Sequence, residues 1–507
     1  MTKTSKVQSV VPPSPVATAG PHADEVSAPL TEQARAIRDG ELSSRELTQM
    51  YLDRIQELDK PETLNSFLLT RGDEVLAEAQ RMDDLQASGK IIGPLHGIPL
   101  GIKDALFTAG TRTTGGTAAL KNFVPTEDAT AVRLLKEAGA LVLGKTNLHE
   151  CGFGITSNNP HFGPVRNPYD PLRIPGGSSG GSGAAVAARL CSAAIGTDTG
   201  GSVRIPAALC GVVGLKPTLG RASRGRMLGL SWSYDVLGPI TRTVSDAAAI
   251  LKVVASGPDP LDPFAADDPS GARLPAAIAE AGANLKGVRI GIPDGYFAED
   301  NTPEVDRVLA ENYKLLESAG AILVPVTVKD VEQASHTGFL TVIPEDVVLT
   351  EEALREAGVE GGIAGNLQSF GADVRAALGS QVGQDAEPVP AFAYAEAMSR
   401  TVPAIRRGFA EALAGVDVLL TATTPATAVP IAEDVEMQHN GRSVDTFATF
   451  VRYAFCISVA GLPAISVPGG IGGTTGLPVG LQFVGAPWSE ARLVEIALAY
   501  ERLAAGV

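Results

Sequence analysis

Residues that form disulfides or bind metals are scarce in this chain. Only four of its 507 residues are cysteines, and none stands in a Cys-x-x-Cys pair. This spacing excludes a disulfide framework and a cysteine-based zinc site, and it indicates free thiols in a reducing compartment, the cytoplasm. Histidine occurs six times, which leaves few candidates for a histidine-dependent catalytic site. The cysteines are Cys151, Cys191, Cys210 and Cys456.

Positive charge is also in deficit. Lysine and arginine together number 41 against 57 aspartates and glutamates, so the formal net charge is −16. An acidic surface repels phosphate backbones, which argues against nucleic acid as a partner. No apolar run reaches the length of a membrane span, so a membrane is not expected as a partner either. A small molecule is the expected binding partner.

The N-terminus lacks the continuous apolar stretch of a secretory signal. Lys3 and Lys6 supply a basic start, but Pro12 and Pro13 interrupt the residues that follow. The segment has too few apolar side chains to offset the entropy lost on ordering. A disordered, proline-rich tail is therefore predicted over residues 1–29.

Patterns of helix and strand alternate beyond residue 30. Ser43 and Glu46 form a capping box before an amphipathic helix. Thr302 as N-cap and Pro303 in the first turn predict the start of another helix. Helices are predicted at 128–138 and 303–318, and strands at 140–144, 288–292, 321–326, 416–421 and 464–468.

This alternation predicts an α/β protein. We expect a single large catalytic domain over 30–507, with a mixed, largely parallel central β-sheet covered by helices on both faces. The Gly- and Ala-rich segment 357–388 has no clear periodicity and is interpreted either as a mobile cap over a site or as a loop.

A glycine- and serine-rich stretch, GGSSGGSGAAVAARLCSAAIGTDTGGSVRIPAALCG, runs from 176 to 211. A phosphate loop would need Lys and Ser or Thr after its last glycine, and a dinucleotide site would need a preceding strand. Neither is present, so no cofactor is expected. Gly176 to Gly180 matches the G-x-S-x-G of a nucleophile elbow, which needs a downstream histidine. The two downstream histidines, His336 and His439, have no motif around them.

Serine can also be activated by lysine instead of histidine. Lys103, Lys145 and Lys216 each follow an apolar run that would carry them inward, where desolvation lowers a lysine pKa. The residues alone do not choose among these three. His149-Glu150 begins like a zinc-binding helix motif, but Phe153 stands where the second histidine is required, so no metal is expected.

Several long strings in the sequence resemble the amidase signature family, and the resemblance covers about residues 31–505. The strings are GPLHGIPLGIKD (93–104), GALVLGKTNLHE (139–150), FGPVRNPYDP (162–171), GGSSGGSGAAVAA (176–188), IGTDTGGSVRIPAALCGVVGLKPT (195–218) and DVLGPITRTVSD (235–246), with weaker matches at 417–431 and 476–485.

The resemblance implies a catalytic triad of serine, cis-serine and lysine on Ser202, Ser178 and Lys103. It also implies an oxyanion hole made by backbone N–H groups of Thr199, Gly200, Gly201 and Ser202. The peptide bond before Ser178 is expected to be cis. Supporting roles are expected for Gly177, Ser179, Asp198, Arg204 and Asp235, the last three as loop-orienting residues or as members of structural ion pairs.

The resemblance implies a serine amidohydrolase that works through an acyl-enzyme. We expect a monomer or homodimer that cleaves a small hydrophobic or aryl amide, with Phe153, Trp232 and Tyr234 lining the substrate pocket. Esters and carbamates carry a similar carbonyl and are plausible substrates. The alternative is a glutamine-amidase-type subunit of a tRNA-dependent amidotransferase complex. A thiol enzyme that uses Cys151 beside Glu150 is a further alternative, against which the serine motifs argue.

Overall fold

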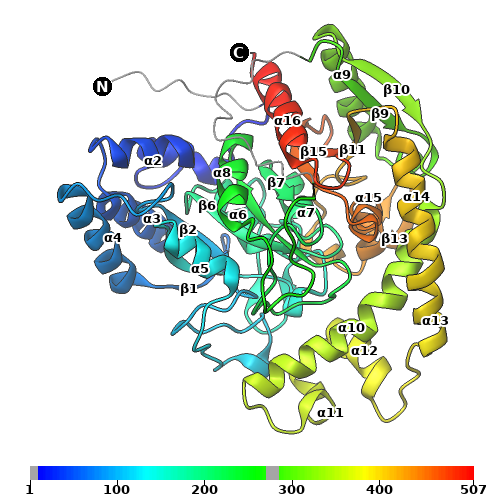
Figure 1. Cartoon of the computed structure of the whole chain (residues 1–507), viewed down its shortest axis with the longest axis horizontal. Coiled ribbons are helices and arrows are strands. Elements are labelled where there is room, and N and C mark those ends of the chain that lie inside the picture. The colour runs from blue at the N-terminus through cyan, green and yellow to red at the C-terminus, as the bar shows by residue number, and fades with distance from the viewer. Residues whose placement is uncertain (1–9, 270–284, 507) are drawn as a thin grey trace.

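Eleven strands form one sheet in the computed structural model, which describes residues 10–269 and 285–506 (Figure 1). Their order across the sheet is β1-β3-β2-β6-β8-β7-β14-β15-β11-β9-β10. The strands are β1 (Phe67–Thr70), β2 (Pro99–Lys103), β3 (Leu141–Thr146), β6 (Ala193–Asp198), β7 (Val213–Lys216), β8 (Val236–Thr241), β9 (Arg289–Pro293), β10 (Ile322–Val326), β11 (Val418–Ala422), β14 (Ala464–Ile471) and β15 (Pro478–Val484). Two small ribbons lie outside this sheet, β4 (Asn158–Asn159) with β5 (Gly163–Pro164) and β12 (Glu436–His439) with β13 (Arg442–Asp445).

Strand directions in the sheet are mixed. Parallel pairing joins β3, β2 and β6 on one side and β11, β9 and β10 on the other. The strands from β8 to β15 between them pair antiparallel. The single large α/β domain with a mixed central sheet is therefore confirmed. Each predicted strand coincides with an observed one, and no end is displaced by more than three residues.

Helices cover both faces of the sheet. α8 and α16 contact each other and the strands, while α6, α7 and α15 make a second contacting group. The helices are α1 (Pro15–Thr18), α2 (Leu30–Arg38), α3 (Ser44–Leu58), α4 (Gly72–Ala87), α5 (Thr130–Glu137), α6 (Gly180–Ala187), α7 (Arg204–Leu209), α8 (Val244–Val254), α9 (Pro303–Ser318), α10 (Ala334–Glu356), α11 (Gly362–Asn366), α12 (Ala372–Val382), α13 (Ala391–Glu396), α14 (Val402–Leu413), α15 (Thr446–Ala460) and α16 (Glu490–Ala504). In the described part of the chain, none of them is long and apolar enough to cross a membrane.

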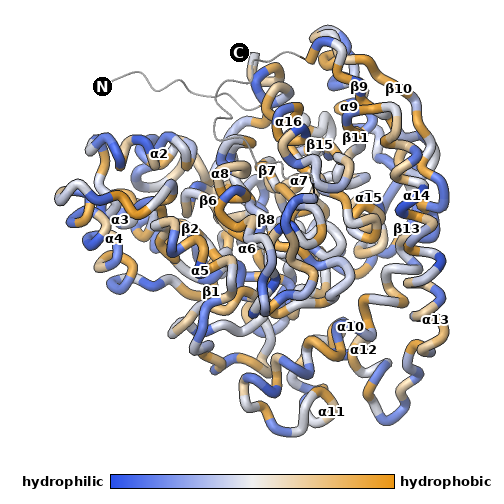
Figure 2. The backbone as a smooth tube through the Cα atoms, in the orientation of Figure 1, coloured by the Kyte–Doolittle hydropathy of each residue, from blue (hydrophilic) through white to orange (hydrophobic). Residues whose placement is uncertain are grey.

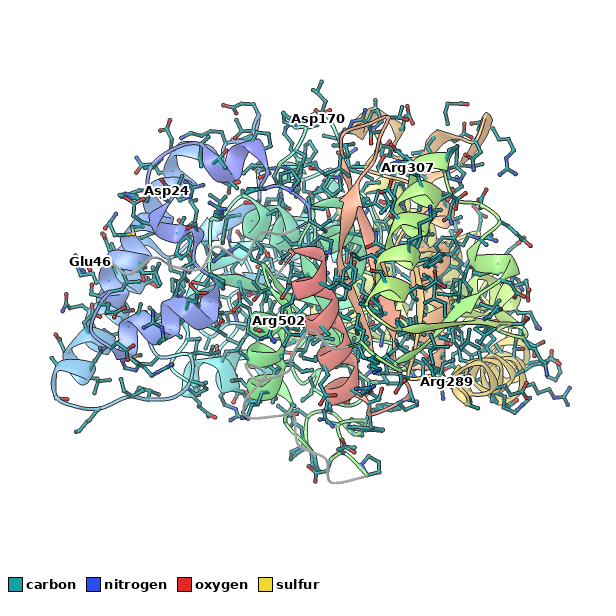
Figure 3. The ribbon with its side chains drawn as sticks, turned by 90° about the horizontal axis from the view of Figure 1, so that it is seen from above. Asp24, Glu46, Asp170, Arg289, Arg307 and Arg502 are labelled. Atoms are coloured by element: carbon teal, nitrogen blue, oxygen red, sulfur yellow. The ribbon has the colours of Figure 1, made fainter. Side chains whose placement is uncertain are left out.

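Apolar and charged residues separate between the centre and the rim. Strands β2, β6, β8, β11 and β15 are buried along their whole length. Outer helices such as α4 and α14 alternate hydrophilic and hydrophobic stretches (Figure 2). The charged side chains of Glu46 and Asp170 lie at the edge of the molecule in Figure 3. This is the distribution expected when apolar burial drives folding.

Of the two predicted helix starts, one has its capping bonds and the other does not. The Ser43 hydroxyl accepts from Glu46 N, and the Glu46 carboxylate accepts from Ser43 N, so the predicted capping box before α3 is confirmed. α9 begins at Pro303 with Thr302 as N-cap, as predicted. The Thr302 hydroxyl makes no capping bond, however, so only the backbone position was predicted correctly.

The prediction of a disordered tail is wrong for residues 10–29; residues 1–9 lie outside the described part. Val11, Ala17 and Val26 are buried against the domain. The Arg54 guanidinium of α3 donates to the carbonyls of Ala19 at 2.9 Å and Pro21 at 2.7 Å. Composition does not reveal such contacts, because the donor stands more than thirty residues along the chain.

Segment 357–388 is not a loop, so that interpretation is wrong. It contains α11 and α12, which pack with α10 around a small apolar cluster below the main core in Figure 1. Motion of this segment as a cap stays a prediction. The buried members of the cluster are Leu120, Leu354, Ile363, Phe370, Val374 and Leu378.

Candidate active site

The ends of two neighbouring strands bring the candidate catalytic groups together. β2 ends at Lys103 and β6 ends at Asp198, and the two strands pair in parallel. The carboxyl ends of parallel neighbours lie at the same edge of a sheet. The loop 199–202 that follows β6 therefore begins close to the end of Lys103's strand.

Lys103 is fully buried and bonded to Ser178. Its Nζ donates to Ser178 Oγ and to Thr197 Oγ1, each at 2.7 Å. Burial lowers the pKa of Lys103 to about 7, against the opposing charges of Asp235 and Asp198. A lysine with this pKa is largely neutral in weakly alkaline solution and can act as a base. The Gly177–Ser178 peptide is cis, as the resemblance implied.

Ser202 lines a cavity together with Gly152, and Ser178 lies beside this wall. A Cβ placed on Gly152 would lie 3.6 Å from Ser178 Oγ, although Ser178 itself is not among the lining residues. Ser179 N also donates to Ser202 O at 3.2 Å, which joins the two serine segments. The Ser179 hydroxyl donates to the Thr197 carbonyl at 3.2 Å.

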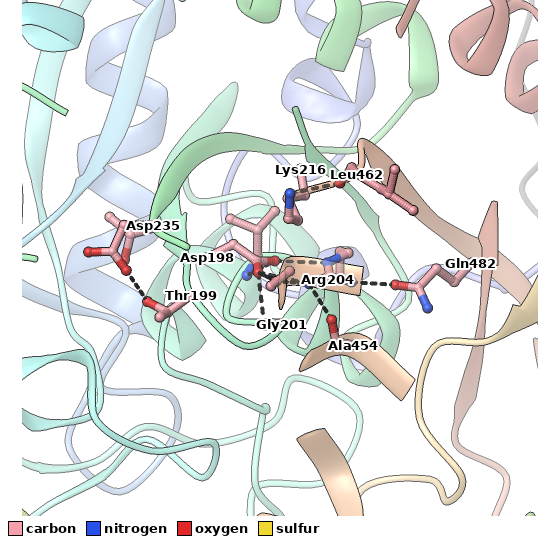
Figure 4. A network of polar contacts seen from close by, with 12 residues as sticks. Asp198, Thr199, Gly201, Arg204, Lys216, Asp235, Ala454, Leu462 and Gln482 are labelled. Atoms are coloured by element: carbon pink, nitrogen blue, oxygen red, sulfur yellow. Dashed lines mark hydrogen bonds and ion pairs between the residues drawn. The ribbon is translucent and has the colours of Figure 1, made fainter. Parts of the chain in front are cut away.

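A buried ion pair shapes the loop before Ser202 (Figure 4). The Asp198 carboxylate accepts from Arg204 Nε at 3.0 Å and Nη2 at 2.9 Å. Burial alone would raise the pKa of Asp198, but the Arg204 charge and hydrogen bonds outweigh it and lower this pKa to about 2. Asp198 also accepts from Gly201 N at 2.8 Å. The Gly201 N–H is thus occupied, and its predicted place in the oxyanion hole is wrong.

The cavity that Ser202 lines has an apolar wall. Phe153 lines it. Tyr234 does not; it packs edge-on behind Phe455, with ring centroids 6.3 Å apart. Trp232 is not among the lining residues either, so both predictions are wrong. The apolar lining residues are Phe153, Ile155, Leu230, Phe339, Val342, Phe447, Val451 and Phe455, and no lining residue is charged.

Sequence reasoning missed the part of this wall that comes from α10 and α15. Phe447, Val451 and Phe455 recur every four residues and so share one face of α15. That periodicity was a usable signal for a helix face, but it does not say which cavity the face borders. Phe339 of α10 had no comparable signal.

The other two buried lysines have different surroundings. Lys145 Nζ donates to the Leu106 carbonyl at 2.6 Å and lies 3.4 Å from Asp104. Lys216 Nζ donates to the carbonyls of Leu462 at 2.8 Å and Pro217 at 3.0 Å. Burial lowers the pKa of Lys145 to about 8 and of Lys216 to about 7. Low pKa therefore does not distinguish the lysines; contact with Ser178 does.

The rival sites are not assembled. Cys151 lines a different cavity from Ser202, and burial raises its pKa well above the usual value, which disfavours the thiolate. His336 is exposed on α10, and His439 Nε2 contacts the Asp300 carbonyl at 2.6 Å. Within residues 10–269 and 285–506 there is no group of three or more side chains suited to a metal ion.

The fold and this lysine–serine site define an amide-bond hydrolase of the α/β class. The family model for Amidase matches residues 46–494, and the chain belongs to this family, the amidase signature enzymes. It is 41% identical over 490 residues to the A subunit of glutamyl-tRNA(Gln) amidotransferase from Myxococcus xanthus, covering 93% of this chain and 96% of the relative.

Two solved structures show the same architecture. The A subunit of glutamyl-tRNA(Gln) amidotransferase from Thermotoga maritima has a TM-score of 0.72 at 30% identity and covers 94% of both chains. The native peptide amidase from Stenotrophomonas maltophilia has a TM-score of 0.75 at 34% identity, covering 94% of this chain and 96% of the amidase.

These relatives correct two expectations from the sequence. Similarity over nearly the whole length is to a subunit of an enzyme named for glutamyl-tRNA. This contradicts the main expectation of a stand-alone amidase for a small hydrophobic or aryl amide. It equally contradicts the expected partners: a small-molecule substrate, no nucleic acid, and a monomer or homodimer. Net charge could not decide the partners, because it averages the surface of the chain.

Proposed function

We propose that Ser202 is the nucleophile of an amide hydrolysis and that Ser178 and Lys103 carry its proton. Neutral Lys103 takes a proton from Ser178, which takes one from Ser202 as Ser202 attacks the carbonyl. The C–N bond then breaks, the proton returns through Ser178 to the leaving nitrogen, and water releases the acyl group. The 2.7 Å contact between Lys103 Nζ and Ser178 Oγ supports this order.

The negative oxygen formed in this attack needs donors. With Gly201 N committed to Asp198, we assign the oxyanion hole to backbone N–H groups of Thr199, Gly200 and Ser202. All three residues line the cavity. Each such donor typically lowers the barrier by about 2.7–4 kcal/mol, and the apolar wall keeps water from weakening it.

Replacement of the nucleophile tests this assignment. Ser202→Ala should remove amide turnover while circular dichroism and melting temperature stay near those of the unmodified chain. Mass spectrometry after treatment with a fluorophosphonate should place the adduct on Ser202. An adduct on Ser178 or Ser179 would show that the nucleophile is wrongly assigned.

At the level of the whole protein, we propose the amide-hydrolysing subunit of a tRNA-dependent amidotransferase. It would release ammonia from glutamine for a partner that acts on charged tRNA. The observation that carries this proposal is the 41% identity over nearly the full length of both chains. We place the assembly in the cytoplasm, which four unpaired cysteines fit.

Capture of the chain from extracts of its own cells tests this proposal. Tagged chain should bring down further subunits, and the captured complex should convert glutamyl-tRNA to glutaminyl-tRNA when L-glutamine and ATP, which activates the carboxylate, are added. A complex captured on Ser202→Ala should need added ammonia instead. No residue lining the cavity is charged, so none of them would pair with the charged groups of glutamine. An uncharged amide should therefore be tested beside glutamine as the donor of ammonia. A chain without partners that cleaves amides alone, with no transfer to tRNA, contradicts the proposal.

The same site should also act on activated aryl esters and carbamates. Attack by Ser202 is the same for these carbonyls, and an aryloxide leaves with less need of a proton. We propose these as side reactions of the acyl-enzyme chemistry, useful because they assay the purified chain without tRNA or partners.

A further inference from the structure

One carboxylate holds two parts of the cavity wall together. Asp235 Oδ1 accepts from Thr199 Oγ1 at 2.5 Å (Figure 4). Asp235 Oδ2 accepts from Leu230 N at 2.8 Å and Ser231 N at 2.9 Å. Thr199 and Leu230 both line the cavity that contains Ser202. The position of Asp235 therefore fixes the loop before Ser202 relative to the neighbouring wall.

A second carboxylate holds the turn that leads to Asp235. Glu345 of α10 is fully buried and accepts from the Ser231 hydroxyl. It also accepts from Ser233 N at 3.1 Å and Ser233 Oγ at 2.6 Å. The Tyr394 hydroxyl of α13 donates to the same group at 2.8 Å. Hydrogen bonds thus run without a break from α13, through α10 and the turn 231–235, to Thr199.

We propose that Asp235 is a positioning residue for attack by Ser202, and that Glu345 makes α10 part of the support of the oxyanion loop. Neither residue lines the cavity, so each acts through the backbone or hydroxyl groups that it holds. The inference rests on the proposed role of Ser202 as nucleophile. It does not depend on the amidotransferase assignment.

The donors around Asp235 also bear on its charge. Burial raises the pKa of Asp235 above its usual value, although its hydrogen bonds and the Arg224 charge act to lower it. The two N–H groups and one hydroxyl that converge on it suit an ionised acceptor. The charged groups that interact with Asp235 are Arg224, Asp346 and Lys103. Lys103 interacts with one further carboxylate, that of Asp198. The Asp235 charge raises the pKa of Lys103 against burial. Its removal should lower that pKa, so that Lys103 becomes neutral at lower pH.

The test uses Asp235→Asn and hydrolysis of a p-nitrophenyl ester by the purified chain. We expect kcat to fall by about 10–100-fold, the scale on which hydrogen bonds to charged groups contribute, with little change in KM. The midpoint of the acid limb of the pH–rate profile should move to lower pH. A purely structural defect would not move that midpoint.

Asp59→Asn is a matched control. Asp59 accepts from Ser66 N at 2.7 Å, Ser66 Oγ at 2.8 Å and Phe67 N at 2.9 Å, the same kinds of donor that Asp235 has. It lies before β1, away from the residues that line the cavity. Asp59→Asn should lower the melting temperature but leave kcat and the acid midpoint unchanged.

Thr199→Val provides the coupling measurement. If Asp235 acts through Thr199, the double variant should lose little more activity than the worse single variant. Glu345→Gln should lower kcat in the same direction by a smaller factor, and it carries the test if Asp235→Asn does not fold.

Four results would each overturn the inference. The first is a loss of kcat in Asp235→Asn no greater than in Asp59→Asn, and the second is an acid midpoint of the pH–rate profile that does not move. The third is a loss of activity in the double variant that equals the sum of the losses in Asp235→Asn and Thr199→Val. The fourth is an Asp235→Asn chain that does not fold together with a Glu345→Gln chain whose kcat is unaltered. If the unmodified protein neither cleaves the ester nor reacts with a fluorophosphonate at Ser202, this inference and the proposed triad are both wrong. Failure of tRNA amidation alone would overturn only the proposed assembly.

Discussion

At the residue scale, hydrogen-bond partners separate three buried lysines that pKa does not separate. Lys103 contacts two hydroxyls, one of which belongs to Ser178. Lys145 has an acidic neighbour, and Lys216 faces backbone carbonyls. Only a lysine next to a serine hydroxyl can pass that serine's proton to a leaving group.

Leaving-group chemistry tests this distinction. An amide nitrogen must be protonated as its bond breaks, whereas an aryloxide needs less help. Lys103→Ala should therefore lower amide turnover by roughly 10²–10⁴-fold and turnover of the matched aryl ester by less. Lys145→Ala and Lys216→Ala should lower stability and show no preference between the two substrates. Selective loss of amide turnover in either of these, with Lys103→Ala unaffected, would assign the base elsewhere.

The pH dependence follows from the same residue. Lys103 acts as a base only when neutral, and burial lowers its pKa to about 7. Amide turnover should therefore rise with pH to a plateau, with a midpoint near 7 rather than near the ordinary lysine value. Rates on one amide from pH 5 to pH 9 measure the midpoint. A profile that is still rising steeply at pH 9 would show a base with an ordinary pKa.

The sequence predicted part of this site. Motif strings placed Lys103, Ser178 and the cis peptide, and the structure brings the lysine and serine into contact. The strings did not reveal that Asp198 occupies the N–H of Gly201. Nor did they reveal the bond between Asp235 and Thr199. A motif gives residue identity and order, whereas these details depend on which donors meet after folding.

At the element scale, the N-terminal segment and α3 form one unit. Arg54 of α3 is fully buried and donates to the carbonyls of Ala19 and Pro21 in the N-terminal segment. It also donates to the carbonyls of Ala188 and Arg189, which follow α6. These carbonyls have few alternative partners once the segment covers them. A buried carbonyl that loses its donor is costly.

Arg54→Ala should therefore destabilise the protein by roughly 2–4 kcal/mol, since it leaves buried carbonyls without a donor. Deletion of residues 1–25 should also lower the melting temperature, because it uncovers the same guanidinium. Arg45→Ala on the exposed face of α3 is the control, and it should change stability little. Chemical denaturation measures all three. A truncated chain as stable as the full chain would mean that the segment only rests on the surface.

At the scale of the whole molecule, local patterns predicted the elements but not their arrangement. Alternation of helix and strand signals gave the α/β class, and β3, β9 and β14 lie where apolar runs predicted strands. The order of strands, which places β14 beside β7 and β11 beside β9, depends on pairings between residues more than a hundred positions apart. Those pairings have no signature within a window of ten or twenty residues.

Arg204 joins several of these distant parts. Besides Asp198, its guanidinium donates to Gln482 Oε1 at 2.7 Å and to the Ala454 carbonyl at 3.0 Å (Figure 4). It also donates to Ser458 Oγ at 2.9 Å. One side chain thus connects the end of β6, strand β15 and helix α15. Arginine and aspartate are both fully buried, so neither charge can be solvated by water if its partner is removed.

Arg204→Met should therefore cost about 3–5 kcal/mol of stability, since it leaves the Asp198 carboxylate buried without its counter-charge. The double variant Asp198→Asn/Arg204→Met should recover part of the loss, because Asp198 no longer leaves a buried charge without its partner. Arg492→Met, which breaks a half-exposed pair with Asp417, is the control and should cost at most about 1 kcal/mol. Urea denaturation of the four chains measures each cost. If the double variant is no more stable than Arg204→Met, the uncompensated charge is not the cause of the loss, and the contacts of Arg204 with β15 and α15 must be the larger contribution.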